Sequence, residues 1–229
     1  MRIQKYLSEQ GVMSRREAEE SMRKGFVTCN GKVVRDLGRQ IDPERDRIRV
    51  LSSSSSAERK MTILVNKPRG VVSSKNPKEG FTVFQMLPQF ANLHVVGRLD
   101  KESEGALLLS NDGPVTASVT SEKHLIEKEY EVWIREVVRP GRIRKMEEGV
   151  LLEDGRTLPA RVSRIDDHAF RIVLREGRKH QIRRMAAVLM LTVTRLKRIR
   201  IGDLTLKGLK EGGFRALSFA EVQAFKRRS

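Results

Sequence analysis

One aspartate stands out among the residues of this 229-residue chain that could do chemistry. Asp100 ends the polar turn Gly97-Arg98-Leu99-Asp100, which separates the apolar residues 95–96 from the apolar run 106–109. Two short apolar runs around a polar turn predict two strands joined by a loop. A carboxylate in such a loop can act as a nucleophile or a base, but it can equally be a solvated group at a hairpin tip.

A second polar stretch, residues 176–185, reads Glu-Gly-Arg-Lys-His-Gln-Ile-Arg-Arg-Met. Its glycine ends a predicted strand, and the residues that follow have the apolar spacing of a helix. Lys179 and His180 lie four and three positions before Arg183, so the three share one side of that helix. Positive charge at a helix start opposes the helix dipole, which indicates a nearby anion, either a phosphate or a protein carboxylate. Alone, His180 is more typical of a surface or packing histidine than of a catalyst.

The charge of the chain predicts a polyanionic partner. Lys and Arg total 46 against 29 Asp and Glu, which gives a formal net charge of +17. Nucleic acid is the commonest partner of so basic a protein, and an anionic membrane surface is the competing interpretation. No long apolar segment or signal peptide is visible, so we expect no membrane partner and a cytoplasmic protein.

Cysteine usage and missing motifs limit the chemistry further. The single cysteine, Cys29, cannot form an internal disulfide, which agrees with a reducing cytoplasm. The sequence shows no Cys, His and carboxylate cluster with metal-ligand spacing and no glycine-rich phosphate fingerprint. We therefore expect neither a metal nor a cofactor.

The first fifty residues predict a small module of two helices and a hairpin. Ser14-x-x-Glu17 has the capping-box pattern of a helix start, and Asn30-Gly31 is typical of a tight hairpin turn. The expected elements are a helix from residue 2 that Gly11 ends, a helix from Ser14 to about Lys24, and strands over 26–28, 32–34 and 48–50.

This module resembles the S4-type RNA-binding domain. The resemblance covers nearly all of residues 2–50 and runs through Arg2, residues 11–18 and Val27-x-x-Asn30-Gly31. It implies that the early helices present basic residues to structured RNA, whereas the alternative is an ordinary solvated helix face. Such contacts mostly meet phosphates, so they position the protein without reading sequence. The candidate RNA-binding residues are Arg2, Lys5, Arg15, Arg16, Arg23 and Lys24.

A serine run marks a domain boundary. Residues 52–56 are all serine, which leaves no apolar face to bury and predicts a flexible tether. We expect an RNA-binding domain over residues 1–50, a linker over 51–60 and a second domain over 61–229. A tethered basic module raises the local concentration of RNA beside the second domain.

The second domain mixes strands and helices irregularly, which indicates an α+β fold rather than a doubly wound sheet. Residues 127–134 alternate charged and apolar side chains, as a half-buried strand does, with Tyr130 on the apolar face. Thr82-x-x-Gln85 and Ser218-x-x-Glu221 are capping boxes that begin helices. Further helices are expected over 113–121, over 142–148 and after Gly177, and strands over 63–66, 71–74, 158–165, 169–174, 193–201 and 204–206.

Four motifs of this domain resemble the RNA pseudouridine synthases, specifically the RsuA-like ribosomal RNA branch. The match spans about residues 61–217, and the order of the motifs behind an S4-type module is highly specific. The resemblance implies a catalytic domain built on a mixed, mainly antiparallel β-sheet flanked by helices. The motifs are Asn66-Lys67-Pro68-x-Gly70; Gly97-Arg98-Leu99-Asp100 with Glu104-Gly105 and Asn111-Asp112-Gly113; Lys128-x-Tyr130-x-Val132; and Gly177-Arg178-x-His180-Gln181-Ile182-Arg183-Arg184-Met185.

The resemblance implies that the chain converts a uridine in ribosomal RNA, free or in a ribosome-assembly intermediate, to its carbon-linked isomer pseudouridine. Asp100 is then the essential carboxylate, which either attacks the anomeric carbon of the sugar or removes the neighbouring ribose proton. Burial alone would oppose its ionisation. The family assigns the cation that keeps it charged to position 183, where Arg183 offers a planar fork. The isomerisation is redox-neutral, which agrees with the missing cofactor motifs.

Four further residues take roles by the same resemblance. Tyr130 should stack on the target base and assist proton transfer from its ring carbon. Arg98 should fill the space that the uridine vacates when it leaves the stack. Lys67 and Lys128 should hold phosphates or support the pocket. Separately, we expect the protein to be a monomer.

Two rival classes of protein make different demands on the sequence. A noncatalytic RNA-binding protein with a decayed second domain would have lost the acid–base residues, yet Asp100, Tyr130 and Arg183 are all present. An S4-linked RNA methyltransferase should show a glycine-rich nucleotide-binding loop, and the sequence contains none.

Deletion of residues 1–50 tests the role of the basic module. We expect the shortened chain to bind RNA more weakly and with a flatter dependence of affinity on salt, because phosphate contacts are lost. A titration of RNA binding over a series of salt concentrations measures both quantities. Unchanged affinity and an unchanged salt slope would contradict this role.

Overall fold

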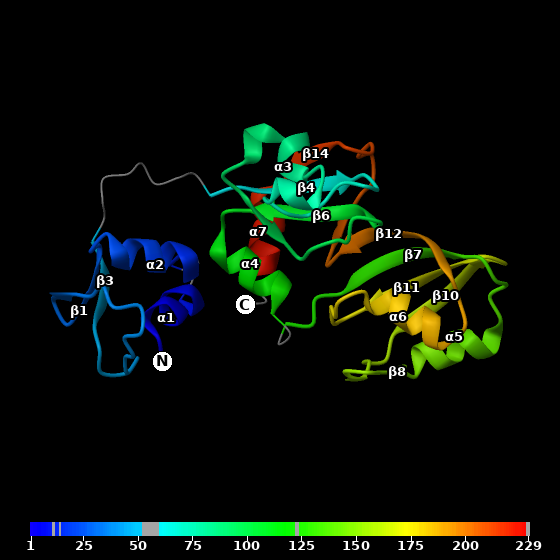
Figure 1. The fold of residues 1–229 in the computed structure, drawn as a ribbon, viewed down its shortest axis with the longest axis horizontal. Helices are drawn as coiled ribbons and strands as arrows, with labels where there is room; N and C mark the ends of the chain where they lie inside the picture. Colours follow the sequence, from blue (N-terminus) through cyan, green and yellow to red (C-terminus); the bar gives the residue numbers. More distant parts are fainter. Residues whose placement is uncertain (11, 14, 52–59, 122–123, 228–229) are drawn as a thin grey trace.

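The computed structural model describes residues 1–10, 12–13, 15–51, 60–121 and 124–227. A small N-terminal module lies at one end of the long axis, and a larger sheet domain occupies the rest (Figure 1). Residues 52–59 of the linker predicted over 51–60, the helix stop at Gly11 and the cap at Ser14 lie outside the described residues. The predicted domain limits therefore stay a prediction.

The N-terminal module packs two helices on a three-stranded antiparallel sheet of order β2-β1-β3. Its core includes Ile3 and Leu7 of the first helix and Ala18 and Met22 of the second, all buried. Asn30 and the glycine after it have positive φ angles of 51° and 82°, as the hairpin signal requires. The elements are α1 (Ile3–Glu9), α2 (Arg15–Arg23), β1 (Val27–Cys29), β2 (Lys32–Val33) and β3 (Ile48–Val50).

The larger domain is built on a nine-stranded sheet within the described residues, of order β10-β11-β7-β12-β6-β4-β14 with β5 on β6 and β13 on β12. Every pairing is antiparallel except the parallel one between β6 and β12, so the predicted mixed, mainly antiparallel sheet is confirmed. The strands are β4 (Thr62–Lys67), β5 (His94–Val96), β6 (Glu104–Ser110), β7 (Lys128–Ile134), β10 (Arg161–Asp166), β11 (Ala169–Leu174), β12 (Val193–Ile201), β13 (Leu204–Thr205) and β14 (Phe214–Ala216).

Helices cover the sheet, and both capping boxes of this domain are confirmed. Thr82 and Gln85 cap one helix reciprocally, and Ser218 and Glu221 cap another. A short separate hairpin, β8 (Leu151–Leu152) and β9 (Gly155–Arg156), lies outside the main sheet. The helices are η1 (Pro77–Glu79), α3 (Val83–Met86), η2 (Pro88–Phe90), α4 (Gly113–Thr120), α5 (Pro140–Glu147), α6 (Gln181–Val188) and α7 (Phe219–Lys226).

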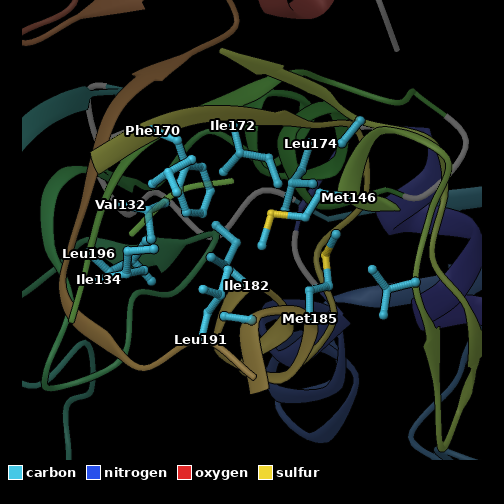
Figure 2. Close-up of a cluster of buried hydrophobic side chains, with 14 of the residues drawn as sticks. Val132, Ile134, Met146, Phe170, Ile172, Leu174, Ile182, Met185, Leu191 and Leu196 are labelled. Carbon is cyan, nitrogen blue, oxygen red and sulfur yellow. The ribbon is translucent and has the colours of Figure 1, made fainter. Parts of the chain in front are cut away.

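Separate hydrophobic cores stabilise the two halves of the sheet. Strands β4 and β6 are buried at every position because helices cover both of their faces, with α3 on one side and α4 and α7 on the other. In the other half, Figure 2 shows Ile182 and Met185 of α6 packed with Met146 of α5 and with Phe170 and Ile172 of β11. The turn carrying Asp100 lies where these two halves meet.

The strand predicted over residues 71–74 is wrong. That segment forms only an isolated bridge between Val72 and Thr82. One of its side chains bonds to the Asp100 turn instead. The Ser73 hydroxyl donates to the Leu99 carbonyl at 2.8 Å and accepts from the Leu99 amide at 3.3 Å. The segment is thus a loop that braces the Asp100 turn. The short strands β8, β9 and β14 were not predicted, since two or three residues carry no periodic signal.

The parallel pairing of β6 with β12 depends on a glycine. Gly105 lies opposite Arg198, and a Cβ added to Gly105 would lie 2.2 Å from the Arg198 carbonyl oxygen. Arg198 is itself 2% exposed, and its guanidinium donates to the carbonyls of Ala106 at 2.6 Å and Gly97 at 2.8 Å. One buried arginine therefore ties β12 to both ends of the segment that contains Asp100.

Substitution Gly105→Ala tests this close approach. We expect a loss of about 3 kcal/mol in the free energy of unfolding, because the methyl group meets backbone that cannot yield and φ is +103°. Gly141→Ala, where nothing lies within 4 Å of the added Cβ, should stay within about 1 kcal/mol of the wild type. Denaturant unfolding of both variants measures the difference, and equal stabilities would contradict the close approach.

Candidate active site

A cavity of about 770 Å³ opens where the two halves of the sheet meet. Its walls come from the turn between β5 and β6, the end of α4, the start of β7, the segment that leads from β11 into α6, and strand β12. Four of the predicted site residues line it: Arg98, Asp100, Lys128 and Tyr130. Lys67 and Arg183 do not line it.

Backbone contacts fix the turn that carries Asp100. The Ser103 amide donates to the Asp100 carbonyl at 3.0 Å, and the Ser73 hydroxyl holds the preceding residue. On the other side of the turn, Arg198 donates to the carbonyl of Gly97, whose φ of +67° suits a glycine. The Asp100 side chain is 39% exposed and lines the cavity, on a turn that these contacts hold in place.

The group facing the Asp100 carboxylate is His180. Its Nε2 lies 3.4 Å from Asp100 Oδ1. His180 is the N-cap of α6. Its backbone is left-handed, with φ of 51°, so it does not continue the right-handed geometry of the helix that follows. A protein carboxylate, one of the two anions predicted beside this helix start, therefore lies next to it.

The predicted pairing of Arg183 with Asp100 is not formed. Arg183 instead donates to the carbonyls of Glu102 at 3.2 Å and Val193 at 3.3 Å. Because α6 begins at Gln181, position 183 points toward the start of β12, and the N-cap histidine takes the place beside the carboxylate. The catalytic role of Arg183 stays a prediction.

Tyr130 lines the cavity and also contacts the hydrophobic cores. It is half-buried on β7 and packs against the hydrophobic cores of both halves of the sheet. Its ring lines the same cavity as Asp100, whereas the exposed Arg98 at the cavity edge has no side-chain hydrogen bond or ion pair among the described residues. A flat ring, a carboxylate and an exposed cation that line one cavity suit a flipped-out nucleotide.

Two lysines, the buried Lys67 and the half-buried Lys128, lie close to the Asp100 turn. Burial lowers the pKa of Lys67 from 10.5 to about 8, against the opposing effect of Glu104 and Asp100. Burial and the neighbouring Arg198 likewise lower the pKa of Lys128 to about 8. Lys128 lines the cavity and donates to the Ile126 carbonyl at 3.2 Å.

The burial of Lys67 argues against direct contact with RNA, and its role stays a prediction. Lys67 is 0% exposed, and its ammonium donates to the carbonyls of Pro68 at 2.8 Å and Val71 at 2.7 Å. It holds the loop after β4 in place, so of its two predicted roles the supporting one agrees with the structure.

The predicted RNA-binding residues of the N-terminal module are all exposed: Arg2, Lys5, Arg15, Arg16, Arg23 and Lys24. Lys5 and Lys24 form pairs one helical turn away, with Glu9 at 3.7 Å and Glu20 at 2.6 Å. Within the described part of the chain, none of the four arginines forms a salt bridge. Exposed pairs of this kind are weak, so all six cations can meet phosphates.

Sequence reasoning missed two residues of the site. The sequence alone favours a surface or packing role for His180, although its place in a cationic helix start beside a predicted anion is a usable signal. Arg198 lies in a strand with several basic residues, and nothing in that pattern separates the buried arginine from its exposed neighbours. None of the described helices is long and apolar enough to cross a membrane. The described residues contain no group of three or more His, Cys, Asp or Glu side chains that could hold a metal ion.

Known proteins match both parts of the chain. The S4 domain family matches residues 1–48, and the family described as RNA pseudouridylate synthase matches residues 61–188. An RNA-binding module ahead of a domain with this pocket defines an RNA-modifying enzyme. The chain belongs to the RNA pseudouridine synthase family, so the catalytic interpretation is confirmed over the noncatalytic one.

Individual relatives cover the chain almost from end to end. Ribosomal large subunit pseudouridine synthase B of Bacillus subtilis is 34% identical over 98% of this chain and 95% of its own length. Ribosomal small subunit pseudouridine synthase A of Haemophilus influenzae is 33% identical over 97% of this chain and 98% of its own. A pseudouridylate synthase crystal structure aligns with a TM-score of 0.74 and 33% identity, covering 98% of this chain and 99% of that one.

The pKa of Lys67 predicts a pH-dependent stability. Between about pH 8 and pH 10.5 the unfolded chain keeps this proton while the folded chain has lost it, so the free energy of unfolding rises with pH. In Lys67→Met that contribution is absent, and the stability of the wild type relative to the variant should rise by roughly 3 kcal/mol across this interval.

Denaturant unfolding at a series of pH values between 7 and 10.5 measures this change. Lys145→Met, at an exposed position of α5, controls for the loss of one positive charge. A stability difference between wild type and Lys67→Met that does not change with pH would contradict the burial argument.

Proposed function

We propose that the chain isomerises specific uridines to pseudouridine in ribosomal RNA, with Asp100 as the essential carboxylate. The observation that carries the proposal is the single cavity that Asp100, Tyr130 and Arg98 all line. The relatives that cover the whole chain are named for the two different ribosomal subunits. Ribosomal RNA is therefore the substrate class they have in common.

The target uridine has to leave the base stack to reach this cavity, at a cost of a few kcal/mol. Arg98, at the edge, can occupy the vacated space, and Tyr130 can stack on the flipped base. The bond between the sugar and ring nitrogen N1 then breaks, and a bond from the sugar to C5 forms. C5 loses a proton and N1 gains one, so the product has the composition of the substrate.

Asp100 acts at the sugar in one of two ways, by attack on the anomeric carbon or by removal of the neighbouring ribose proton. Either step requires an ionised carboxylate. His180 faces Asp100 in the free protein. Arg183 donates to the carbonyl of Glu102, which is two residues after Asp100. It can reach Asp100 if RNA binding releases that hydrogen bond.

We further propose that the protein acts as a cytoplasmic monomer. The support is that one chain supplies every described wall of the cavity and that ribosomal RNA is the substrate class. The exposed cations of the N-terminal module then meet RNA phosphates and hold the substrate beside the cavity.

Substitution Asp100→Asn tests the chemistry apart from binding. We expect RNA affinity within about threefold of the wild type and a loss of pseudouridine formation of at least about 1,000-fold, because the amide is neither a nucleophile nor a base. Affinity is measured by titration, and product by mapping pseudouridine in ribosomal RNA from cells lacking this protein.

Glu211→Gln, at an exposed loop position, is the matched control and should keep full activity. Full activity of Asp100→Asn would overturn the proposed role. An affinity loss large enough to account for the missing product would also contradict it.

A further inference from the structure

The wall of the cavity opposite Asp100 is a short segment without regular secondary structure. Residues 176–180 connect β11 to α6 and carry His180 to its place beside the Asp100 carboxylate. Five consecutive residues of this segment line the cavity, so its position fixes the width of the site. A loop that defines a catalytic geometry needs external support.

The segment is held by Arg178, whose guanidinium points away from the helix and onto the β8–β9 hairpin. It donates to the carbonyls of Gly155 at 2.8 Å and Arg156 at 2.7 Å, and its Nε pairs with Glu176 Oε2 at 3.0 Å. The Gln181 side chain closes the loop by accepting from the Arg178 amide at 3.0 Å and donating to Glu176 Oε1 at 2.6 Å.

A second arginine fastens the same hairpin to the helix. Arg184 donates to both carboxylate oxygens of Asp154, at 2.6 Å and 3.1 Å, and the pKa of Asp154 is lowered to about 2 by this interaction. A bidentate arginine–carboxylate pair fixes orientation as well as distance. Asp154 also accepts from Arg178 at 3.4 Å, so one carboxylate contacts both arginines.

The hairpin is itself anchored in the interior. Val150 and Leu152 are 5% and 6% exposed and belong to the core formed by α5, α6, β7 and β11. The chain closes tightly there, since a Cβ on Gly149 would lie 2.4 Å from the Thr157 carbonyl oxygen. The turn at Asp154 is thus a projection from a rigid base.

Asp154 does not line the cavity, and it is not part of the machinery described above. We propose that Asp154 is a positioning residue for catalysis: through Arg178 and Arg184 it holds residues 176–180 against the cavity and so sets the distance between His180 and Asp100. The proposal rests on the proposed function of that cavity. It gives the β8–β9 hairpin a role in the reaction although no residue of the hairpin lines the site.

A positioning role for Asp154 differs in its consequences from a purely electrostatic or a purely stabilising one. If Asp154 only tuned the charge of the RNA-binding surface, its removal would tighten RNA binding, and removal of the adjacent exposed Glu153 would do the same. If Asp154 only stabilised the domain, its loss would accelerate local opening throughout the sheet. A positioning role predicts a slower chemical step together with loosening confined to residues 176–181.

The experiment compares Asp154→Asn with Glu153→Gln, which removes one charge from the neighbouring residue. Single-turnover pseudouridine formation on ribosomal RNA from cells lacking the protein should fall about 10- to 100-fold in Asp154→Asn. Its RNA affinity should stay within about twofold of the wild type. Amide hydrogen exchange in residues 176–181 should accelerate roughly tenfold, with β4 and β6 unchanged. Glu153→Gln should match the wild type in every measurement.

Arg184→Gln, which keeps the hairpin turn and removes the bidentate partner, should reproduce the Asp154→Asn result and serves if that variant does not fold. A wild-type single-turnover rate in either variant overturns the proposal, as does accelerated exchange spread over the whole domain. If the wild-type protein forms no pseudouridine, the proposed function fails, while localised exchange in Asp154→Asn still supports the contact that the hairpin makes.

Discussion

The site depends on one close backbone approach between two strands far apart in the sequence. Gly105 of β6 lies against the Arg198 carbonyl of β12 with no room for a side chain, and this parallel pairing joins the two halves of the sheet. The Arg198 side chain then returns across the junction to the carbonyls of Gly97 and Ala106. The Asp100 turn is thereby held between two hydrophobic cores, and the cavity exists because those cores meet at a junction that only a glycine permits.

Charge explains how this position can serve an anionic substrate. Lys67, Lys128 and Arg198 place buried or half-buried positive charge behind the Asp100 turn. These positive charges attract the phosphates of RNA toward the site. By contrast, Arg178 and Arg184 are engaged by protein acceptors and shape the cavity wall. The basic residues of the chain therefore have two roles: some attract RNA, and others hold the structure of the cavity wall.

Local features and family motifs could be identified from the sequence, whereas contacts between segments far apart in the chain could not. The capping boxes at Thr82 and Ser218 and the turn at Asn30 depend on residues within a few positions, and the structure contains all three. The predicted strand over residues 71–74 is a loop because Ser73 bonds to Leu99, a contact that no local pattern encodes. The same limit applies to the partner of Asp100. That partner is His180, the residue directly before the first residue of α6, Gln181.

The most direct test of the central claim is a map of pseudouridines in ribosomal RNA from cells with and without this protein. We predict that one or a few uridines in one subunit lose the modification when the gene is deleted. The wild-type gene should restore them, and a gene encoding Asp100→Asn should not. An unchanged map after deletion, or full restoration by the Asp100→Asn gene, would contradict the claim.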